Sequence, residues 1–354
     1  KQYIGQTFEI KSFVNGPDLK IKIISDDGVD MEFGTGAVGV TPAHSQADYQ
    51  MYQKNNLDLI KVIDENGKMM GNIGKEYVGL MVEEARKKVV ANLEKDGLMA
   101  EAKKEISNNL SVCYRCGTTV EPLTSLQWFI DVNKKFPAKG GSAFGGKIKG
   151  IKKGKEVSLK ELMQTVVKKG QIKIVPERFL KIYFSWIDNL RDWCISRQIW
   201  YGHQIPVWYC KSEKCKTKSE KEKIIVSIED VKNCPDCDGV AEQDQDTLDT
   251  WFSSGLWTFS TLGYPDLNAE DLKNYHPISV METGYDILFF WVARMILMTT
   301  YTLGVIPFET VYLHGLVRDE NGQKMSKSLG NVIDPLDMID RYGTDATRLS
   351  LLLG

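Results

Sequence analysis

The chain has 354 residues, of which 42% are hydrophobic and 26% charged, with a formal net charge of −2 at pH 7. This length allows two or three domains, and the balanced charge gives no support for binding nucleic acid through a general basic excess. The chain has seven cysteines, an odd number, and residues 1–11 contain no apolar run of the kind found in signal peptides. Both observations argue against a secreted protein held together by disulfides. We expect reduced thiols or metal ligands in a cytoplasmic protein.

Residues 1–106 alternate short extended runs with turns, and Glu83 to Lys95 has the apolar periodicity of a helix. The run Gly34-Thr35-Gly36-Ala37-Val38-Gly39 matches the dinucleotide motif G-x-G-x-x-G literally. That motif needs a helix opening at its end, but Thr41-Pro42 follows, and the residue before a proline prefers extended geometry. We therefore expect no dinucleotide site here.

Polar groups gather in residues 41–48, on a turn and the expected start of a short helix. A lone histidine such as His44 is more often structural than catalytic, whereas Asp48 could orient an ammonium group or a water. Cys113 and Cys116 then form an isolated pair, either redox-active or half of a zinc site.

The stretch from Lys139 to Lys155 is rich in glycine and contains no acid. We expect a solvated loop; the alternative is a phosphate-contacting loop, because lysine clusters release counterions from a nucleic-acid backbone. Its lysines are Lys139, Lys147, Lys149, Lys152, Lys153 and Lys155.

A helix should follow this stretch, because Ser158 and Glu161 have the spacing of a capping box. Gly170 should end the helix. The residues predicted to form its buried stripe are Leu159, Leu162, Met163, Val166 and Val167.

Four cysteines have metal-ligand spacing: Cys210 and Cys215 precede Cys234 and Cys237. Two close pairs across a short gap can supply four thiolates to one tetrahedral Zn²⁺. Such a site would be structural, because four thiolates leave no open position for water. Four unrelated thiols are the alternative.

The stretch from Ile287 to Phe308 is mostly apolar and could be mistaken for a membrane span. Arg294 lies near its middle, where a charge would cost about 2.5–3.5 kcal/mol in a bilayer. Gly304 and Pro307 end the run. We predict a buried core helix and no membrane partner.

Near the end of the chain, Lys324-Met325-Ser326-Lys327-Ser328 lies between Gly322 and Gly330. Two lysines three residues apart on a loop can reach a triphosphate and neutralise charge as pyrophosphate leaves, and Ser326 and Ser328 add donors. This is not a Walker loop, because no G-x-x-x-x-G-K precedes it. A plain basic turn is the alternative.

Residues 324–328 also spell the KMSKS signature of class I aminoacyl-tRNA synthetases, and the flanking residues 312–319 and 330–335 resemble the same family. The subgroup that handles valine, isoleucine and leucine carries an inserted editing domain, which residues 34–44 resemble. Residues 191–198 resemble the return into the catalytic domain. The resemblance extends over nearly the whole chain, with the pieces in the family's order.

Three stretches favour valine as the amino acid: residues 200–206, 248–254 and 282–288. The resemblance therefore implies ATP-dependent activation of valine and its transfer to tRNA(Val), with hydrolysis of threonine mischarged onto that tRNA. An isoleucine enzyme is the rival within the family. A non-catalytic, zinc-containing RNA-binding protein is the rival from another class.

The resemblance also implies roles for individual residues. Lys327 and Lys324, with Ser326 and Ser328, would bind ATP phosphates, with Mg²⁺ expected beside them, and no DNA partner is implied. His314 and Gly315 would lie at the adenine, Gly284 and Asp286 at the ribose, and Trp251 and Trp291 would be walls of the valine pocket. Thr41 and Asp48 would act in editing. Cys210, Cys215, Cys234 and Cys237 would form a zinc knuckle, and Cys113 and Cys116 would belong to a second, shared zinc site.

Two positions depart from the family pattern in the editing segment, since Gly39 stands where lysine is common and Ser45 where aspartate is common. The family's H-x-G-H signature is also absent from the sequence. It is expected upstream of the editing insertion, and an anticodon-binding domain is expected downstream. We therefore expect this chain alone to be inactive in amino-acid activation.

The implied fold is α/β. Residues 1–106 would be the C-terminal part of a β-rich editing domain, and residues 107–180 a connector with the cysteine half-site, basic loop and helix. Residues 181–345 would form the second half of a Rossmann-like catalytic domain, with the zinc knuckle at 205–245 and the KMSKS loop at 324–328. Residues 346–354 would begin a helical domain.

Overall fold

The computed structural model describes residues 2–10, 18–32, 35–71, 73–99, 109–113, 116–139, 146–215 and 222–353. The chain divides into two compact units, Lys1–Leu126 and Gln127–Gly354. The division between them falls inside the predicted connector 107–180, whose bounds stay a prediction. Residues 127–180 contribute a helix and a strand to the core of the second unit.

The first unit contains more helix than strand among its described residues, so the β-rich character expected of it is not seen there. Its two strands pair antiparallel, with Thr7 opposite Lys22, and all their residues are exposed. Two strands without a covering layer bury little apolar surface. The elements are β1 (Thr7–Ile10), β2 (Leu19–Lys22), α1 (Gln46–Asn55) and α2 (Val82–Lys95).

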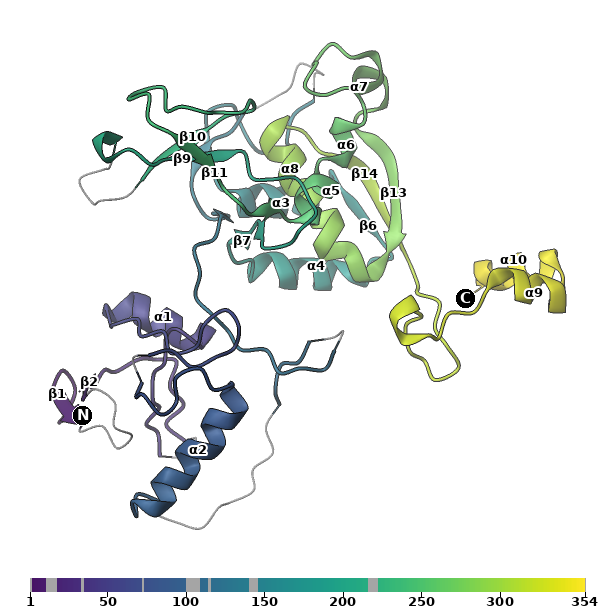
Figure 1. Ribbon diagram of the computed structural model, residues 1–354. Helices are drawn as coiled ribbons and strands as arrows, with labels where there is room; N and C mark the ends of the chain where they lie inside the picture. The colour runs from purple at the N-terminus through teal and green to yellow at the C-terminus, as the bar shows by residue number, and fades with distance from the viewer. Residues whose placement is uncertain are drawn as a thin grey trace. The chain divides into compact units, whose positions relative to one another are not determined.

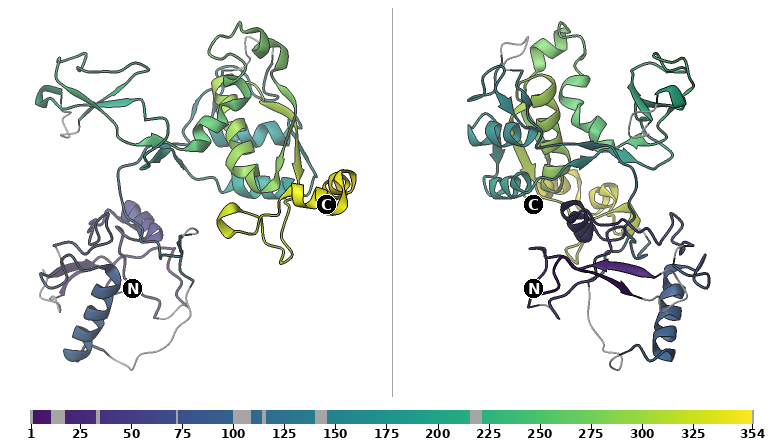
Figure 2. Two further views of the ribbon diagram at one scale, coloured as in Figure 1. Left: turned by 45° about the vertical axis from the view of Figure 1, so that its right-hand side comes forward. Right: turned by 90° about the vertical axis from the view of Figure 1, so that its left-hand side faces the viewer.

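The second unit is built on a parallel three-stranded sheet in the order β13-β14-β6. Figures 1 and 2 show α3, α4 and α8 gathered against this sheet, which agrees with the single apolar cluster that these elements share. Helix-covered parallel strands define an α/β unit, as predicted. These elements are α3 (Leu159–Lys168), β6 (Lys173–Val175), α4 (Phe179–Asp188), β13 (Ile278–Gly284), α8 (Arg294–Thr302) and β14 (Phe308–His314).

Helix α3 confirms the prediction made for it. The Ser158 hydroxyl accepts from the Glu161 N–H (3.2 Å), and the Glu161 carboxylate accepts from the Ser158 N–H (2.9 Å). Its buried residues are the five predicted ones, and Gly170 follows with a φ of +63°.

The apolar stretch 287–308 is the crossover between β13 and β14. It consists of the end of a 3₁₀ turn, η2 (Tyr285–Ile287), a π-helical turn, η3 (Leu288–Ala293), and α8, in which seven residues are buried. The buried core helix is thus confirmed, and the π turn is an addition to the prediction. None of the helices in the described residues meets the length and hydropathy needed to cross a bilayer.

Smaller sheets surround this core. A three-stranded antiparallel ribbon has the order β10-β9-β11, and short pairs join β8 to β12, β3 to β7 and β4 to β5. The elements are β3 (Phe129–Ile130), β4 (Phe136–Pro137), β5 (Glu156–Val157), β7 (Trp193–Cys194), β8 (Ser196–Arg197), β9 (Val207–Cys210), η1 (Glu213–Cys215), β10 (Lys223–Val226), β11 (Ala241–Gln243) and β12 (Thr247–Leu248).

Short helices complete the second unit. Helices α9 and α10 pack against each other, and Gly343 joins them at a φ of +85°. The elements are α5 (Thr250–Gly255), α6 (Trp257–Ser260), α7 (Glu270–Tyr275), η4 (Lys327–Leu329), α9 (Pro335–Tyr342) and α10 (Thr344–Leu353).

Candidate functional site

The carboxyl ends of β13 and β14 bring together residues that are distant in sequence. The parallel register places Gly284 level with His314, and Asp286 follows two residues later in η2. A Cβ atom on Gly284 would lie 2.7 Å from the Asp286 carboxylate and 3.1 Å from the Leu316 side chain, so glycine lets these side chains approach the strand end closely. Ligands of open α/β sheets bind at this end of the strands.

The imidazole of His314 is held at the edge of this site. Its Nε2 lies 3.2 Å from a carboxylate oxygen of Glu282 on β13, and its Nδ1 lies 2.6 Å from the Gly315 carbonyl oxygen. Since the ring remains half exposed, it presents a face to solvent beside Gly284.

The segment that carries KMSKS begins as a tight hairpin, in which Arg318 bridges antiparallel to Lys324. The Asp319 carboxylate accepts from the N–H groups of Asn321 (3.0 Å) and Gln323 (2.8 Å). A carboxylate that receives several donors keeps its charge.

Asn331 fastens the other side of the loop. Its amide nitrogen donates to the Asp319 carboxylate (2.7 Å) and its amide oxygen accepts from the Ser326 N–H (2.9 Å). The bond from Asn331 is the main reason that the pKa of Asp319 lies below its usual value. The Ser326 hydroxyl also accepts from the Leu329 N–H (3.3 Å), so the loop is folded upon itself.

The loop meets the strand ends through two contacts. The Lys324 ammonium lies 2.5 Å from a carboxylate oxygen of Asp286, and the Arg318 guanidinium donates to the Tyr285 hydroxyl (2.8 Å). Lys327 is exposed and forms no ion pair with any residue in the described part of the chain. The Ser328 side chain lies outside the described residues.

Trp251 and Trp291 lie on elements that pack together, α5 and the π turn. The Trp291 indole N–H donates to the Ser254 carbonyl oxygen (3.0 Å), and its ring lies 6.1 Å from Trp257. Trp251 stacks on Phe290 at 5.9 Å and 28°. Both indoles are therefore fixed by aromatic neighbours, and the η2 and η3 turns connect Trp291 to Asp286.

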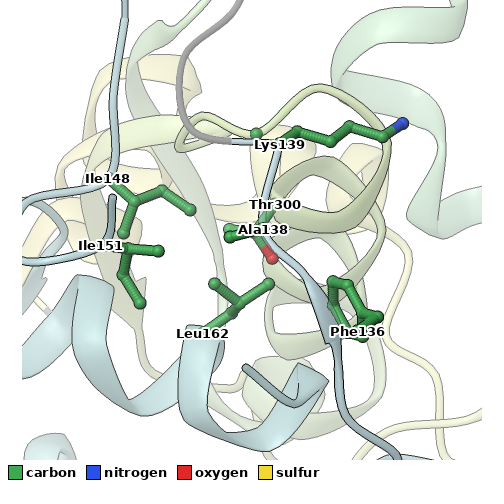
Figure 3. Close-up of a pocket in the computed structure, with 8 residues that line it drawn as sticks. Phe136, Ala138, Lys139, Ile148, Ile151, Leu162 and Thr300 are labelled. Carbon is green, nitrogen blue, oxygen red and sulfur yellow. The ribbon is translucent and has the colours of Figure 1, made fainter. Parts of the chain in front are cut away.

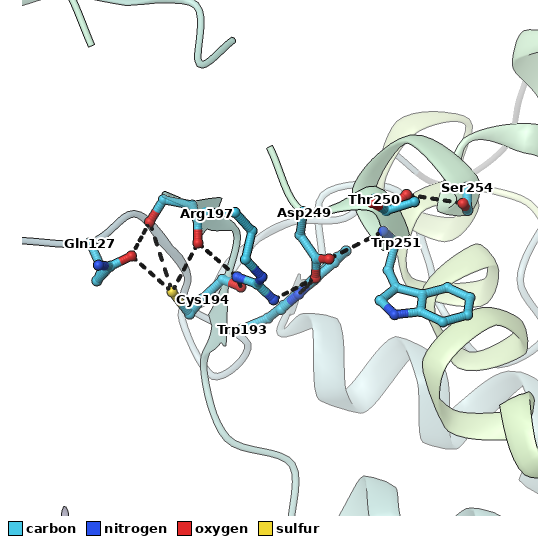
Figure 4. Close-up of polar contacts among 9 residues, drawn as sticks. Gln127, Trp193, Cys194, Arg197, Asp249, Thr250, Trp251 and Ser254 are labelled. Carbon is cyan, nitrogen blue, oxygen red and sulfur yellow. Dashed lines mark hydrogen bonds and ion pairs between the residues drawn. The ribbon is translucent and has the colours of Figure 1, made fainter. Parts of the chain in front are cut away.

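A buried carboxylate orients the helix that bears Trp251 (Figure 4). Asp249 caps α5 by accepting from the Trp251 N–H (3.3 Å). The same carboxylate accepts from the Trp193 indole (3.0 Å) and the Arg197 guanidinium (2.9 Å). Its side chain is only 8% exposed, whereas that of Arg197 is 39% exposed.

A second arginine lies deeper in this network. The Arg294 guanidinium carbon is 3.9 Å from the centre of the Trp193 ring, a cation–π contact. Burial lowers the pKa of Arg294 to about 10, and the charge of Asp249 opposes that shift. Its Nη1 is buried without a hydrogen-bond partner, and the negative charge of Asp249 favours the protonated form of this guanidinium.

The four predicted cysteines converge. Their sulfur atoms all lie within 4.8 Å of one another, with Cys210–Cys237 at 3.5 Å and Cys215–Cys234 at 3.8 Å. Tetrahedral coordination at about 2.3 Å requires sulfur atoms about 3.8 Å apart. The cluster could therefore hold one metal ion.

One thiol of the cluster is predisposed to ionise. Hydrogen bonding from the Cys215 thiol, followed by that from the Gly239 N–H, lowers the pKa of Cys237 to about 6. A thiolate is the form that binds metal. The supporting turn has Asp238 at a φ of +56° and leaves little space at Gly239, where a Cβ would lie 2.6 Å from Ser212.

In the first unit the structure also brings Thr41 and Asp48 together. One Asp48 oxygen accepts from the Thr41 N–H (2.8 Å) and hydroxyl (3.2 Å), and Asp48 is 8% exposed. Residues 36–42 are not helical, and α1 begins only after Ser45, which agrees with the expectation of no dinucleotide site. Gly34 lies outside the described residues.

Cys113 and Cys116 lie at a turn of the first unit. The Cys113 N–H donates to the Thr118 carbonyl oxygen (2.8 Å), and the Cys116 thiol donates to the Thr118 hydroxyl (3.3 Å). Once Cys116 is ionised, the Thr118 hydroxyl can donate to its sulfur, and this lowers the pKa of Cys116. Within the described residues they belong to no group of three or more potential metal ligands, so their shared zinc site stays a prediction.

Sequence reasoning did not assign roles to Asp319, Asn331 or Asp249. The run Asp319-Glu320-Asn321-Gly322 is a hairpin signal that could have indicated the turn before KMSKS. Asp249 before α5 is a recognisable N-cap. The long-range partners of Asn331 and Asp249 leave no such local signal.

Comparison with known proteins agrees with this geometry. The family described as tRNA synthetases class I (I, L, M and V) matches residues 49–354. The chain therefore belongs to this family, with the α/β fold of its class.

Particular relatives are valine–tRNA ligases. The chain is 47% identical to that of Clostridium tetani over 339 residues, covering 95% of this chain and 34% of the relative. It is 46% identical to that of Clostridium acetobutylicum, covering 100% and 36%, and 47% identical to that of Petrotoga mobilis, covering 94% and 34%. The chain thus spans about a third of the length of these curated relatives.

Replacing Asp249 should show how much the second unit depends on this carboxylate. In Asp249→Ala the Trp193 and Arg197 donors lose their acceptor and Arg294 loses its countercharge, so the free energy of unfolding should fall by about 3 kcal/mol. Urea denaturation followed by tryptophan fluorescence measures this. Asp271→Ala removes an exposed carboxylate of α7 and should change little; equal effects of the two substitutions would contradict the assigned role.

Proposed function

We propose that this chain is part of a valine–tRNA ligase, which activates valine with ATP and transfers it to tRNA(Val). The observation that carries the proposal is the contact of Lys324, in a KMSKS loop, with Asp286 at the carboxyl ends of two parallel strands. Similarity to valine–tRNA ligases over nearly the whole chain supports valine over isoleucine.

In the proposed reaction, the valine carboxylate attacks the α-phosphorus of ATP, and pyrophosphate leaves as valyl-adenylate forms. Lys324 and Lys327 would neutralise the charge that accumulates on the departing pyrophosphate, with Mg²⁺ as the expected counterion. A terminal ribose hydroxyl of tRNA(Val) then attacks the valyl carbonyl carbon, and AMP leaves.

The other site residues would bind and orient the substrates. His314 and Gly315 would lie at the adenine, and Gly284 and Asp286 at the ribose; the parallel register that places Gly284 level with His314 supports this. Trp251 and Trp291 would limit the amino-acid pocket without offering a polar group to the substrate side chain. Because these substrates are cytoplasmic, we propose the same compartment for the protein.

Valine-dependent exchange of pyrophosphate into ATP by the complete gene product tests the proposal. Lys327→Ala should lower kcat by about 10²–10³-fold with little change in the KM for valine, because its charge acts mainly in the transition state. Lys181→Ala, at an exposed position of α4, is the matched control. Preference for isoleucine, or full activity of Lys327→Ala, would refute this assignment.

We further propose that Cys210, Cys215, Cys234 and Cys237 hold a structural Zn²⁺. The convergence of four sulfur atoms at distances suited to a tetrahedron supports this. When bound, the ion supplies cross-links rather than chemistry. The cysteines would thereby fix β9 to the turns on either side of the ribbon.

Metal analysis of the purified chain should find one zinc per molecule. Cys234→Ser should abolish it, because the ion loses one of four ligands, and the ribbon should become susceptible to proteolysis. Cys194→Ser removes a thiol outside the cluster and should retain zinc. Zinc retained at full stoichiometry in Cys234→Ser would count against the site.

Editing is proposed as a second activity, in which the first unit hydrolyses threonyl-tRNA(Val). A second site is needed because an apolar pocket discriminates poorly between valine and threonine. Valine-specific synthetases are the known example, since their amino-acid pocket rejects threonine only about 10²-fold. The hydrogen bonds that Thr41 donates to the buried Asp48 carboxylate support the proposal, because they hold the Thr41 hydroxyl beside a carboxylate that could orient water.

Release of threonine from threonyl-tRNA(Val) by the complete gene product measures editing. Asp48→Ala should slow release by about 10²-fold, whereas valine activation should be unaffected. Asp58→Ala, at an exposed position of the same unit, should release threonine at the normal rate. If Asp48→Ala and Asp48→Asn both edit normally, Asp48 has no part in the reaction.

A further inference from the structure

The lysine-rich segment 146–155 is anchored in the core of the second unit. Ile148 and Ile151 are only 4% and 8% exposed. Figure 3 shows both side chains directed inward, toward Leu162 of α3, while Lys139 extends away from them. Two buried isoleucines three residues apart fix the path of the chain between them.

Hydrogen bonds hold the backbone of this segment on both sides. The Gln171 side chain accepts from the Lys149 N–H (2.5 Å) and donates to the Lys147 carbonyl oxygen (2.9 Å). The Ala138 N–H donates to the Lys155 carbonyl oxygen (2.9 Å). The backbone of residues 146–155 is therefore anchored to the core, while its lysine side chains remain exposed to solvent.

Six lysines are presented by this surface, here called the lysine surface. Five lie within the segment and are exposed, and a Cβ on Gly150 would lie 3.6 Å from the Lys169 side chain, which adds a sixth. The six form no ion pair with a described acid, and Glu161 is already engaged by Lys135 at 2.6 Å. Glu156 borders the surface. The lysine surface consists of Lys147, Lys149, Lys152, Lys153, Lys155 and Lys169.

We infer that the lysine surface contacts the phosphate backbone of RNA, and, resting on the proposed function, that this RNA is tRNA(Val). Exposed ammonium groups on an anchored backbone, without an ion-pair partner among the described acids, attract a polyanion and release its counterions. Residues 147–155 contain no aromatic or amide side chain with which to read bases, so their contacts should be independent of sequence.

The same residues disfavour a lipid surface. Membrane association through a surface segment requires apolar side chains that enter the headgroup region. Here both isoleucines point into the protein, and the remaining residues from 147 to 155 are lysine and glycine. Charge without an apolar face fits a hydrated nucleic-acid backbone better.

Binding of a tRNA(Val) transcript to the complete gene product, measured by fluorescence anisotropy across KCl concentrations, tests the inference. The triple variant Lys149→Gln, Lys152→Gln, Lys153→Gln should bind about tenfold or more weakly at about 0.1 M salt. The slope of log K against log[KCl] should fall in magnitude by about 2–3, and a non-cognate tRNA should lose the same amount.

The matched control is Lys181→Gln, Lys232→Gln, Lys273→Gln, which removes three exposed lysines elsewhere in the second unit. An unchanged Tm for both variants shows that folding is intact. The inference is overturned if the two triple variants lose equal affinity, or if no tRNA binds. It is also overturned if only binding to phosphatidylserine-containing vesicles is lost.

The assay separates this inference from the proposed function. If the protein activates valine but the lysine substitutions leave its affinity for tRNA unchanged, the ligase assignment stands and the inference is refuted. If the protein activates no amino acid, but the lysine substitutions still reduce the slope of log K against log[KCl], the RNA contact stands and the ligase assignment is refuted.

Discussion

Parallel hydrogen bonding between β13 and β14 determines the arrangement of the second unit. It places Gly284 level with His314, and so fixes where the two following loops can meet. Parallel neighbours require a long crossover, which here is the buried segment from η2 to α8. Within this crossover, η2 carries Tyr285 and Asp286, the two residues that the KMSKS segment contacts.

Two ion pairs in this unit have different physical characters. Lys324 and Asp286 are 58% and 26% exposed, and exposed pairs contribute about 0–1 kcal/mol, so Lys324 can exchange its carboxylate for a ligand phosphate at little cost. Asp249, only 8% exposed, pairs with Arg197 at 2.9 Å, and breaking a pair that has a buried partner is costly. The exposed pair suits a lysine that must exchange its carboxylate partner for a ligand, whereas the buried carboxylate of Asp249 suits a structural role.

Local signals in the sequence predicted much of this structure. The capping box at Ser158 and the periodicity after it located α3, and cysteine spacing identified the four thiols that converge. The KMSKS residues were assigned through resemblance, and the structure brings Lys324 to Asp286. Residues whose partners are remote were missed, as Asp249 and Arg197 are 52 positions apart. The β-rich character predicted for the first unit is not seen in its described residues, where β1 and β2 pair with each other, and its assignment to an editing domain stays a prediction.

The π turn at Leu288–Ala293 has a consequence for how the crossover tolerates changes in length. A π turn accommodates one residue more than an α turn over the same part of a helix. Deletion of a single residue here could be absorbed by conversion to α-helix, leaving α8 and η2 in place. The aromatic side chains between them would be redistributed around the axis. Natural length variation at this turn would thus alter the surroundings of Trp291 while sparing the strand order.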